Sequence, residues 1–550
     1  MKFKKKLNNI FYKLHKYNKN TLSLLLIPLI SFFGSVWQAL YAYDGFHWGL
    51  ILFTADSINL KPVNLYKDVF IHYGPLTTLL ESFVLKFFSS NIIYIFALIS
   101  LFYAISIFII LVLINNIINY SYAILGSILI FSFHPFVISP WHNYIVFFFF
   151  NLYILLNFSN KLYLNYISPF LLSLAILFSE SFLYPAILIL TCDLTLSYYE
   201  KNKLKEKIFI ILVKSLSFII PLIIFFLCIF YKKLIDQWLI YHSLPNMYLR
   251  EVLKTDIFHL VLEFFLKIFN NSYKKFFSEP QWFILVIIII SNLFYFIKNI
   301  IPFFLFKKNK IYLLISFSTL VFLYNGIHNL ALFKFATGSI LGIIIFLKII
   351  SSIKNIDNKL IIISFICLVS LSGLELSKNN SNQLYVDNYK INDFKNSDYF
   401  KYFYNQRWDD QTWLNLISLD KNLKQIKQQC NIQYAVNLTS DGFYSVIARD
   451  YFILDQMMPW YENTDGTYIN MNLFYDSFFN YFDKDFYLRI FNNTMNKNLV
   501  IITDKQNFEN ILVQNKKINL SENMNYIDLP YSYYHKKKAI LFPKNCIFNN

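Results

Sequence analysis

Asp44 and His47 directly follow the first long apolar stretch of the chain, and Lys67, Asp68 and His72 come shortly after them. A carboxylate can act as a general base toward a hydroxyl group, and a neighbouring Lys or His can stabilise a phosphate or another bound anion. Placing charged groups beside apolar segments is costly unless water or a partner compensates for it. These residues are therefore the first candidates for chemistry.

The elements around them are those of a membrane protein. Of the 550 residues, 56% are hydrophobic and only 15% are charged, which excludes an ordinary water-soluble enzyme. The net charge of +17 is spread as short Lys clusters between apolar runs rather than as one stripe, so it indicates membrane orientation and not nucleic-acid binding.

The apolar runs predict a polytopic α-helical membrane protein with about eleven spans. The predicted spans are residues 21–40, 92–116, 122–139, 143–159, 163–179, 181–198, 208–230, 281–299, 311–325, 333–351 and 359–376. Residues 76–88 are also apolar but contain Glu81 and Lys86, which favours an interfacial or re-entrant helix.

Lys-rich loops orient these spans, because short loops rich in Lys and Arg stay in the cytoplasm. Seven N-terminal Lys and the clusters at 200–207, 298–310 and 354–359 all fall inside if residues 76–88 do not span. We therefore expect a plasma (inner) membrane protein with a cytoplasmic N-terminus. The first loop, residues 41–91, and everything after residue 376 are then outside.

This topology brings polar residues from separate spans to one membrane face. Besides the first-loop residues, they include His142, Glu180, His328 and Lys334. A base and several cations at a lipid surface suit group transfer from a lipid phosphate carrier.

The composition turns polar after residue 376, which divides the chain into a membrane domain, 1–376, and a soluble domain, 377–550. Helical and strand patterns alternate there: helices are expected at 413–428, 475–491 and 508–515, and strands at 432–438, 498–504 and 538–543. This alternation predicts a small α/β domain. Cys430 and Cys546 lie in it and can pair if the domain is outside the cell, while their spacing alone leaves pairing open.

One segment carries a family resemblance. Asp44, then Tyr66, Lys67, Asp68 and Phe70, then Tyr73, Gly74 and Pro75 resemble the first outer loop of GT-C superfamily membrane glycosyltransferases. That group includes the protein O-mannosyltransferases and the aminoarabinose transferases. Many members have an acidic pair where this chain has Asp44 followed by Gly45, so a shared-carboxylate or metal-binding role is in doubt here.

The resemblance implies inverting transfer from a polyprenyl-phosphate sugar to an acceptor hydroxyl, with Asp44 as the base. The acceptor would be a lipid, a glycan or a protein, with membrane lipid around the site and no nucleic acid involved. Lys67, His72, Arg250 and Lys334 would stabilise the phosphate, and Asp68, Tyr73 and Glu180 would line the cavity. The resemblance assigns no cofactor or metal ligand, and a divalent metal stays possible.

Structural roles compete with these assignments. Asp44 can cap a helix beginning at Phe46, Asp68 can cap or turn the entry to the next helix, and Gly74 and Pro75 can shape the backbone. Asp56 is interpreted as an ordinary polar residue of a short helix. Residues 441–450 could form an acidic site, but a helix start after a turn is the simpler interpretation.

Two other functions remain open. A transporter or flippase of lipid-linked saccharides would need a polar path across the bilayer, whereas most spans look wholly apolar. A polysaccharide polymerase or ligase would also use outer residues, but its main loop lies late in the chain.

Overall fold

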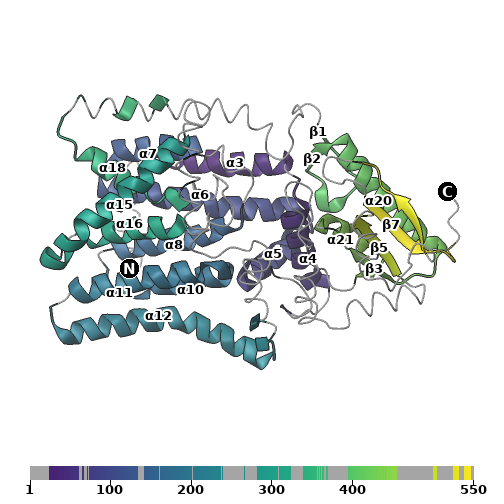
Figure 1. Ribbon diagram of the computed structural model, residues 1–550, viewed down its shortest axis with the longest axis horizontal. Helices are drawn as coiled ribbons and strands as arrows, with labels where there is room; N and C mark the ends of the chain where they lie inside the picture. The colour runs from purple at the N-terminus through teal and green to yellow at the C-terminus, as the bar shows by residue number, and fades with distance from the viewer. Residues whose placement is uncertain are drawn as a thin grey trace, which may run out of the picture. The chain divides into compact units, whose positions relative to one another are not determined.

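The computed structural model describes most of the chain, in several separate stretches. The described residues are 24–60, 71–133, 141–236, 281–323, 338–355, 394–454, 499–504, 524–531 and 538–546, with single-residue gaps within these ranges and isolated residues between them. Figure 1 shows the helices and strands with their labels.

The chain folds into two compact units. The helical unit comprises residues 1–39, 96–225 and 258–384, and the mixed unit comprises residues 40–95, 226–257 and 385–550. The first loop thus belongs to the same unit as the C-terminal region. The domain boundary at residue 376 stays a prediction.

The helical unit consists of apolar helices that are packed side by side. Within the described residues they are α3 (Leu26–Tyr41), α6 (Ile92–Ile117), α7 (Tyr120–Phe133), α8 (Asn143–Phe158), α9 (Leu162–Ile167), α10 (Pro169–Phe178), α11 (Leu183–Glu200), α12 (Leu204–Tyr231), α15 (Gln281–Phe306), α16 (Lys310–Phe322) and α18 (Ile343–Ser351). The pairs α8 with α10, α15 with α16 and α11 with α16 are in contact.

Four helical segments in the described part of the chain are long and apolar enough to cross a membrane: 92–117, 180–200, 204–231 and 282–306. Each of the first ten predicted spans overlaps a described helix. The eleventh, residues 359–376, lies mostly outside the described residues, so the count of about eleven stays a prediction.

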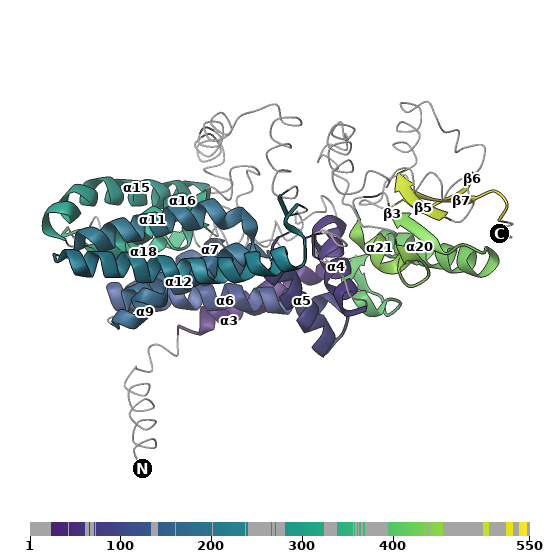
Figure 2. The same cartoon turned by 90° about the horizontal axis from the view of Figure 1, so that it is seen from below.

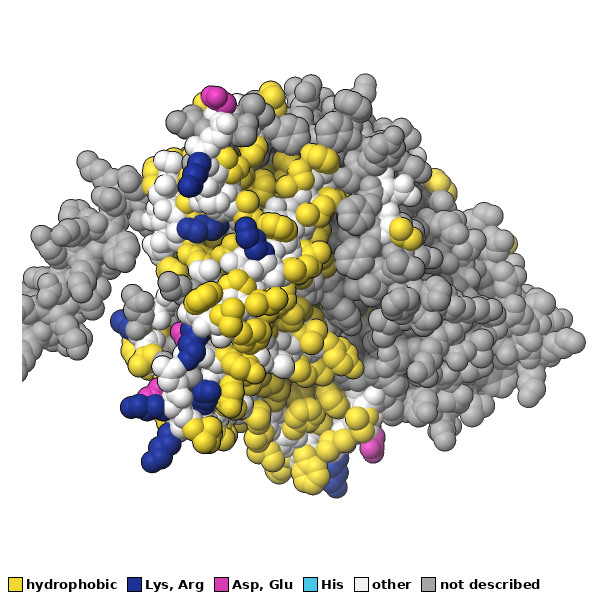
Figure 3. All heavy atoms as spheres, turned by 60° about the vertical axis from the view of Figure 1, so that its left-hand side comes forward, with side chains coloured by type: hydrophobic (Ala, Val, Ile, Leu, Met, Phe, Trp, Pro, Cys, Tyr) yellow, Lys and Arg dark blue, Asp and Glu magenta, His cyan; other side chains and the backbone are white. Residues whose placement is uncertain are grey.

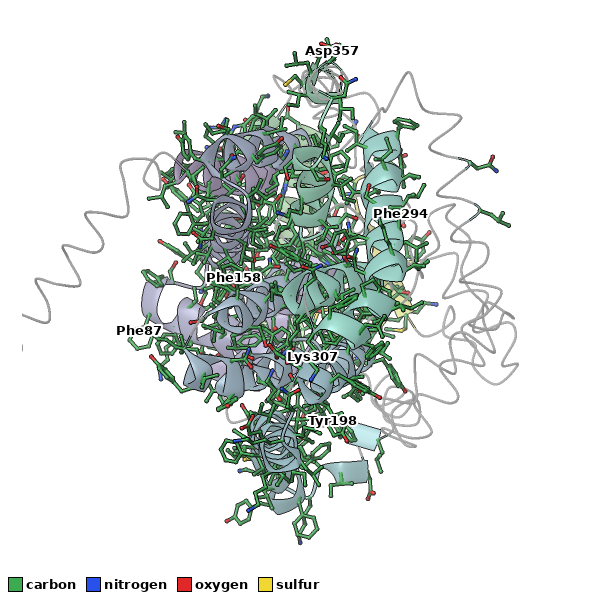
Figure 4. The ribbon with its side chains drawn as sticks, turned by 90° about the vertical axis from the view of Figure 1, so that its left-hand side faces the viewer. Phe87, Phe158, Tyr198, Phe294, Lys307 and Asp357 are labelled. Atoms are coloured by element: carbon green, nitrogen blue, oxygen red, sulfur yellow. A yellow bond between two sulfur atoms is a disulfide. The ribbon has the colours of Figure 1, made fainter. Side chains whose placement is uncertain are left out.

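The outward faces of these helices are apolar. Leu227 on α12 is 61% exposed and Phe294 on α15 is 59% exposed. Phe294 points away from the helices in Figure 4. Figure 3 shows apolar side chains across this face of the helical unit, with most Lys and Arg side chains along one edge. Such a surface suits contact with lipid, because in water it would be an exposed apolar patch of unusual size.

Helix α12 lies along the lower edge of the helical unit in Figure 1 and in front of the other helices in Figure 2, which is seen from below. Ser217 on α12 donates a hydrogen bond to the backbone oxygen of Ile167, 3.0 Å away, and its Oγ accepts one from the amide of Phe170. These polar contacts join α12 to the end of α9 and the start of α10, while its exposed surface is largely apolar.

The mixed unit begins with a π-helical turn, η1 (Gly45–Gly49), followed by α4 (Leu50–Leu60) and α5 (Pro75–Phe88). With fourteen residues, α5 is about 21 Å long, which is less than the roughly 30 Å apolar core of a bilayer. Its start at Pro75, with Gly74 at the N-cap in extended conformation, confirms the structural role expected for both residues.

A five-stranded mixed sheet with strand order β4-β3-β5-β7-β6 forms the C-terminal part of this unit. Its strands are β3 (Tyr434–Asn437), β4 (Ile453–Leu454), β5 (Leu499–Asp504), β6 (Met524–Asp528) and β7 (Lys538–Pro543). Strand β3 pairs parallel with β4 and β5, whereas β7 pairs antiparallel with β5 and β6. Before it lie β1 (Phe394–Asn396), antiparallel to β2 (Arg407–Asp409), α20 (Asp410–Gln429) and α21 (Gly442–Ala448).

Four predicted C-terminal elements match these assignments: α20, β3, β5 and β7. The helices expected at 475–491 and 508–515 lie outside the described residues. Cys430, after α20, and Cys546, after β7, form a disulfide, which settles the question that their spacing left open.

Candidate active site

Asp44 is the N-cap of η1. Its Oδ1 accepts a hydrogen bond from the backbone N–H of His47 at 2.9 Å. Asp44 thus has the capping role that competed with its assignment as a base, although the turn begins at Gly45 and not at Phe46. A cap fixes the carboxylate in one orientation because the acceptor oxygen must face the helix terminus.

The second carboxylate oxygen of Asp44 has its own partner. Oδ2 lies 2.7 Å from Nδ1 of the His47 ring. The Asp44 side chain is 15% exposed and that of His47 is 43% exposed, so solvent or a ligand can reach the pair. A carboxylate held by an imidazole in this way can accept or pass on a proton. His47 was among the first candidates for chemistry in the sequence, but the family resemblance assigned it no role.

Asp441, almost 400 positions later in the chain, contacts the residues on both sides of Asp44. The hydroxyl of Tyr43 donates a hydrogen bond to Oδ2 of Asp441. A Cβ atom on Gly45 would lie 2.2 Å from Oδ1 of Asp441, so a larger residue at position 45 would force the Asp441 side chain to move. Asp441 is also the N-cap of α21, as the interpretation of residues 441–450 as a helix start expected.

Two further glycines bring α21 against the start of α4. A Cβ on Gly49 would lie 2.4 Å from the backbone nitrogen of Phe443, and one on Gly442 would lie 2.3 Å from that of Leu50. These neighbours are backbone atoms, which cannot move aside as the end of a flexible side chain can. The two backbones therefore touch directly, and η1 is fixed on the C-terminal part of its own unit.

Asp56 is not the ordinary polar residue that the sequence suggested. It is only 3% exposed. Its Oδ2 lies 2.5 Å from Nη2 of Arg449, and its Oδ1 accepts a hydrogen bond from Ser90 at 2.6 Å. A buried carboxylate needs such partners because desolvation is otherwise too costly. The interpretation from the sequence was wrong because the partner of Asp56, Arg449, lies 393 positions further along the chain, where no local pattern connects the two residues.

Helix α5 packs on α4 and carries a second buried acid. Asn59 of α4 and Ser82 of α5 exchange two hydrogen bonds, at 2.8 and 3.0 Å. Glu81 is 1% exposed, and burial raises the pKa of its carboxyl well above the usual range.

The remaining predicted site residues are only partly described. Tyr73 is half-buried, directly before Gly74 and α5, in the same unit as Asp44. Glu180 lies in the helical unit, as the first residue of the 3-10 turn Glu180–Phe182. Lys67, Asp68, His72, Arg250 and Lys334 lie outside the described residues. Among the residues that are described, no group of three or more His, Cys, Asp or Glu side chains could hold a metal ion.

The helical unit has a charged cluster of its own. Lys214 Nζ lies 2.7 Å from Asp193 Oδ2, and both side chains are fully buried. Lys310 Nζ lies 3.3 Å from the other oxygen of Asp193. Tyr153 donates a hydrogen bond to Asp193 at 2.8 Å. The expectation that most spans are wholly apolar misses this cluster, whose charges compensate one another and tie α8, α11, α12 and α16 together.

Comparisons with known proteins find similarity in structure and not in sequence. No protein-family model and no curated protein matches the chain. The crystal structure of ArnT from Cupriavidus metallidurans bound to undecaprenyl phosphate matches with a TM-score of 0.52 and 8% identity, over 94% of this chain and 97% of that one. The same protein in the apo state gives the same values. The chain therefore shares the overall fold of this ArnT structure.

A third similar structure is the oligosaccharyltransferase of Archaeoglobus fulgidus in complex with Zn and sulfate. It has a TM-score of 0.46 and 11% identity, over 80% of this chain and 62% of that one. The family resemblance of the first loop thus agrees with a fold match to ArnT that extends over nearly the whole chain. At 8% identity, the match establishes the fold of a multi-pass membrane protein but not which residues correspond.

Proposed function

We propose that the protein transfers a sugar from a polyprenyl-phosphate carrier to an acceptor hydroxyl, with Asp44 as the general base. The observation that carries the proposal is the ArnT fold over 94% of the chain, since that ArnT structure holds undecaprenyl phosphate. The first-loop pattern from Asp44 to Pro75 supports the same reaction class.

The reaction balances with one base and one leaving group. The acceptor oxygen forms a bond to the anomeric carbon of the sugar while the bond from that carbon to the phosphate oxygen breaks. The hydroxyl proton passes to Asp44, and polyprenyl phosphate leaves with the bonding electrons. A single displacement of this kind inverts the anomeric configuration.

The surroundings of Asp44 support its role as the base. Both of its oxygens are held, one by the backbone N–H of His47 and the other near the His47 ring, so the carboxylate is oriented before substrate binds. Pre-orientation of this kind lowers the barrier because the reacting groups need not be ordered later. The partly exposed side chain leaves room for a hydroxyl to approach.

Charge grows on the phosphate as it leaves, so cations should lie near it. Lys67, His72, Arg250 and Lys334 are our candidates for that role, with Asp68, Tyr73 and Glu180 lining the cavity. The acceptor is a hydroxyl on a lipid, a glycan or a protein.

We place the site on the outer face of a plasma membrane, with the N-terminus in the cytoplasm. The Cys430–Cys546 disulfide supports this side, because disulfides persist in oxidising compartments and are rare in the cytosol. Fusion of alkaline phosphatase or green fluorescent protein after residue 550 tests it. Active phosphatase with a dark fluorescent fusion agrees with the proposal, and the reverse pattern contradicts it.

The reaction class is tested with purified protein in lipid nanodiscs. Radiolabelled sugar is supplied as polyprenyl monophosphate, polyprenyl diphosphate or nucleotide sugar, together with candidate acceptors from each of the three classes. We expect transfer from the monophosphate carrier alone and an inverted anomeric configuration in the product. Transfer from nucleotide sugars alone, or retained configuration, would overturn the proposal.

A further inference from the structure

We propose that Asp441 is a positioning residue for Asp44: it holds the residues on either side of Asp44 and so sets the direction of the Asp44 carboxylate. This inference rests on the proposed function, since it gives Asp441 a part in the reaction of Asp44. It assigns to the C-terminal region a role in catalysis that its sequence does not indicate.

The first contact fixes the residue before Asp44. The Tyr43 hydroxyl donates to Asp441 Oδ2, and both side chains are buried, with 3% of Tyr43 and 6% of Asp441 exposed. The Tyr43 ring also packs edge-on against Trp408 and Phe443, with ring centroids 4.8 and 5.3 Å apart. Tyr43 is thus held by its ring and by its hydroxyl.

The second contact fixes the residue after Asp44. The Asp441 carboxylate lies so close to the backbone at Gly45 that a Cβ there would overlap all three of its terminal atoms, at 2.2 to 2.6 Å. Gly45 is the first residue of η1, the turn that Asp44 caps. The same carboxylate therefore contacts the residue before Asp44 and the residue after it, and restricts the backbone from which the Asp44 side chain projects.

Asp441 is itself anchored to the sheet. Asn437, the last residue of β3, donates through Nδ2 to the backbone oxygen of Asp441 at 2.7 Å. The Asp441 amide donates to Thr439 Oγ1 at 3.2 Å, and Asp441 Oδ1 accepts from the Phe443 amide at 2.8 Å. Strand β3 pairs with β4 on one side and β5 on the other, so the backbone that holds Asp441 is fixed within the sheet.

Capping of α21 alone does not account for this geometry. The cap uses Oδ1, whereas the bond from Tyr43 uses Oδ2. The variant Tyr43→Phe removes the second contact and leaves the cap intact. The variant Asp441→Asn keeps the size of the side chain and removes its charge.

Asp409 provides a matched control. It caps α20 in the same manner, accepting from the amide and the hydroxyl of Thr412 at 2.9 and 2.6 Å, and is 2% exposed. Asp409→Asn therefore reports the cost of weakening a buried cap in the same unit without disturbing Tyr43 or Gly45.

The first test measures sugar transfer by the full chain in nanodiscs. Because misplacement of a catalytic group by about 1 Å can cost about 100-fold in rate, we expect Tyr43→Phe and Asp441→Asn to lower kcat by about 10- to 100-fold. The donor KM should stay within about twofold, and Asp409→Asn should keep kcat within about twofold. An unchanged kcat in Asp441→Asn, or an equal loss in Asp409→Asn, would overturn the proposal.

The second test needs no substrate, so it separates this inference from the proposed function. Diethylpyrocarbonate modifies the partly exposed His47 ring at a rate that depends on its contact with Asp44, and peptide mass spectrometry measures that rate in the full chain. We expect Asp44→Asn to change the rate and Asp441→Asn to change it in the same direction, with Asp409→Asn like the wild type. Equal rates in Asp441→Asn and the wild type contradict the positioning role even if sugar transfer is found. If the chain transfers no sugar but Asp441→Asn changes the modification rate as expected, the proposed function is contradicted. The inference that Asp441 positions Asp44 and His47 is then still supported.

Discussion

Nη2 of Arg449 lies 2.5 Å from Oδ2 of Asp56, and this ion pair joins two residues that are 393 positions apart in the chain. The Arg449 side chain is 12% exposed and the Asp56 side chain 5%, so little water compensates either charge. Together with the glycine contacts at Gly49 and Gly442, the pair holds α4 on α21 within the mixed unit.

Removing both partners of this pair should cost less than the sum of the two single removals. We expect Asp56→Ala to destabilise the chain by about 3 to 5 kcal/mol, because it leaves the guanidinium buried without its carboxylate. The double variant Asp56→Ala, Arg449→Met should cost less than the sum of the two single variants. Unfolding of the purified chain in detergent measures the cycle, and strict additivity would show that the two side chains do not interact.

Gly49→Ala should disrupt the contact between α4 and α21. The new methyl group would lie 2.4 Å from the Phe443 backbone nitrogen, so the two backbones must separate. Overpacking typically costs about 1 to 3 kcal/mol. Gly126→Ala is the matched control, because its Cβ would meet the end of the flexible Ile114 side chain at 2.7 Å. Equal unfolding midpoints for the two variants would argue against the backbone contact.

The Asp193 cluster predicts an asymmetry between its members. Asp193→Asn leaves both Lys214 and Lys310 without their shared carboxylate, whereas Lys214→Met leaves Asp193 paired with Lys310 at 3.3 Å. The loss should be about 3 to 5 kcal/mol for Asp193→Asn and smaller for Lys214→Met. The exposed Lys205 supplies a Lys→Met control. A larger loss in Lys214→Met than in Asp193→Asn would contradict this account of the cluster.

Glu81 should make stability depend on pH. Its folded-state pKa is raised by burial above the usual value of 4.5, so the folded chain holds this proton more tightly than the unfolded chain does. Its contribution to stability is complete below pH 4.5 and is lost as the pH rises toward the raised pKa. Glu81→Gln should remove this loss of stability at higher pH. Glu206→Gln, at an exposed position, should leave it unchanged. Unfolding midpoints measured from pH 4 to pH 8 test this, and parallel curves for Glu81→Gln and the wild type would refute it.

The sequence predicted the elements whose signal is local. The runs that became α6, α12 and α15 are long and apolar, as a lipid-facing helix must be. Helix α20 shows regular apolar spacing, and β5 and β7 are short apolar runs. Strand β6, with the sequence MNYID, was missed because Asn525 and Asp528 interrupt its short apolar pattern, and β4 has only two residues.

The site could be predicted only in part, because its contacts join distant segments. Asp44 was identified by its place after the first span, but neither Asp441 nor Arg449 carries a local signal of its partner. One signal was present: the chain has only 11 Gly, and Gly45, Gly49 and Gly442 all take part in one contact. Two glycines four positions apart at a helix start can indicate close backbone approach.

The role of Asp44 is the central claim, and a single substitution tests it most directly. Transfer from radiolabelled polyprenyl-phosphate sugar is measured for the wild type, Asp44→Asn and the control Asp410→Asn, whose side chain is 60% exposed in a surface pair with Lys395. Loss of a general base removes about 100-fold or more in kcat, so we expect that loss in Asp44→Asn and wild-type transfer in Asp410→Asn. Full transfer by a folded Asp44→Asn chain would contradict the assignment of the base.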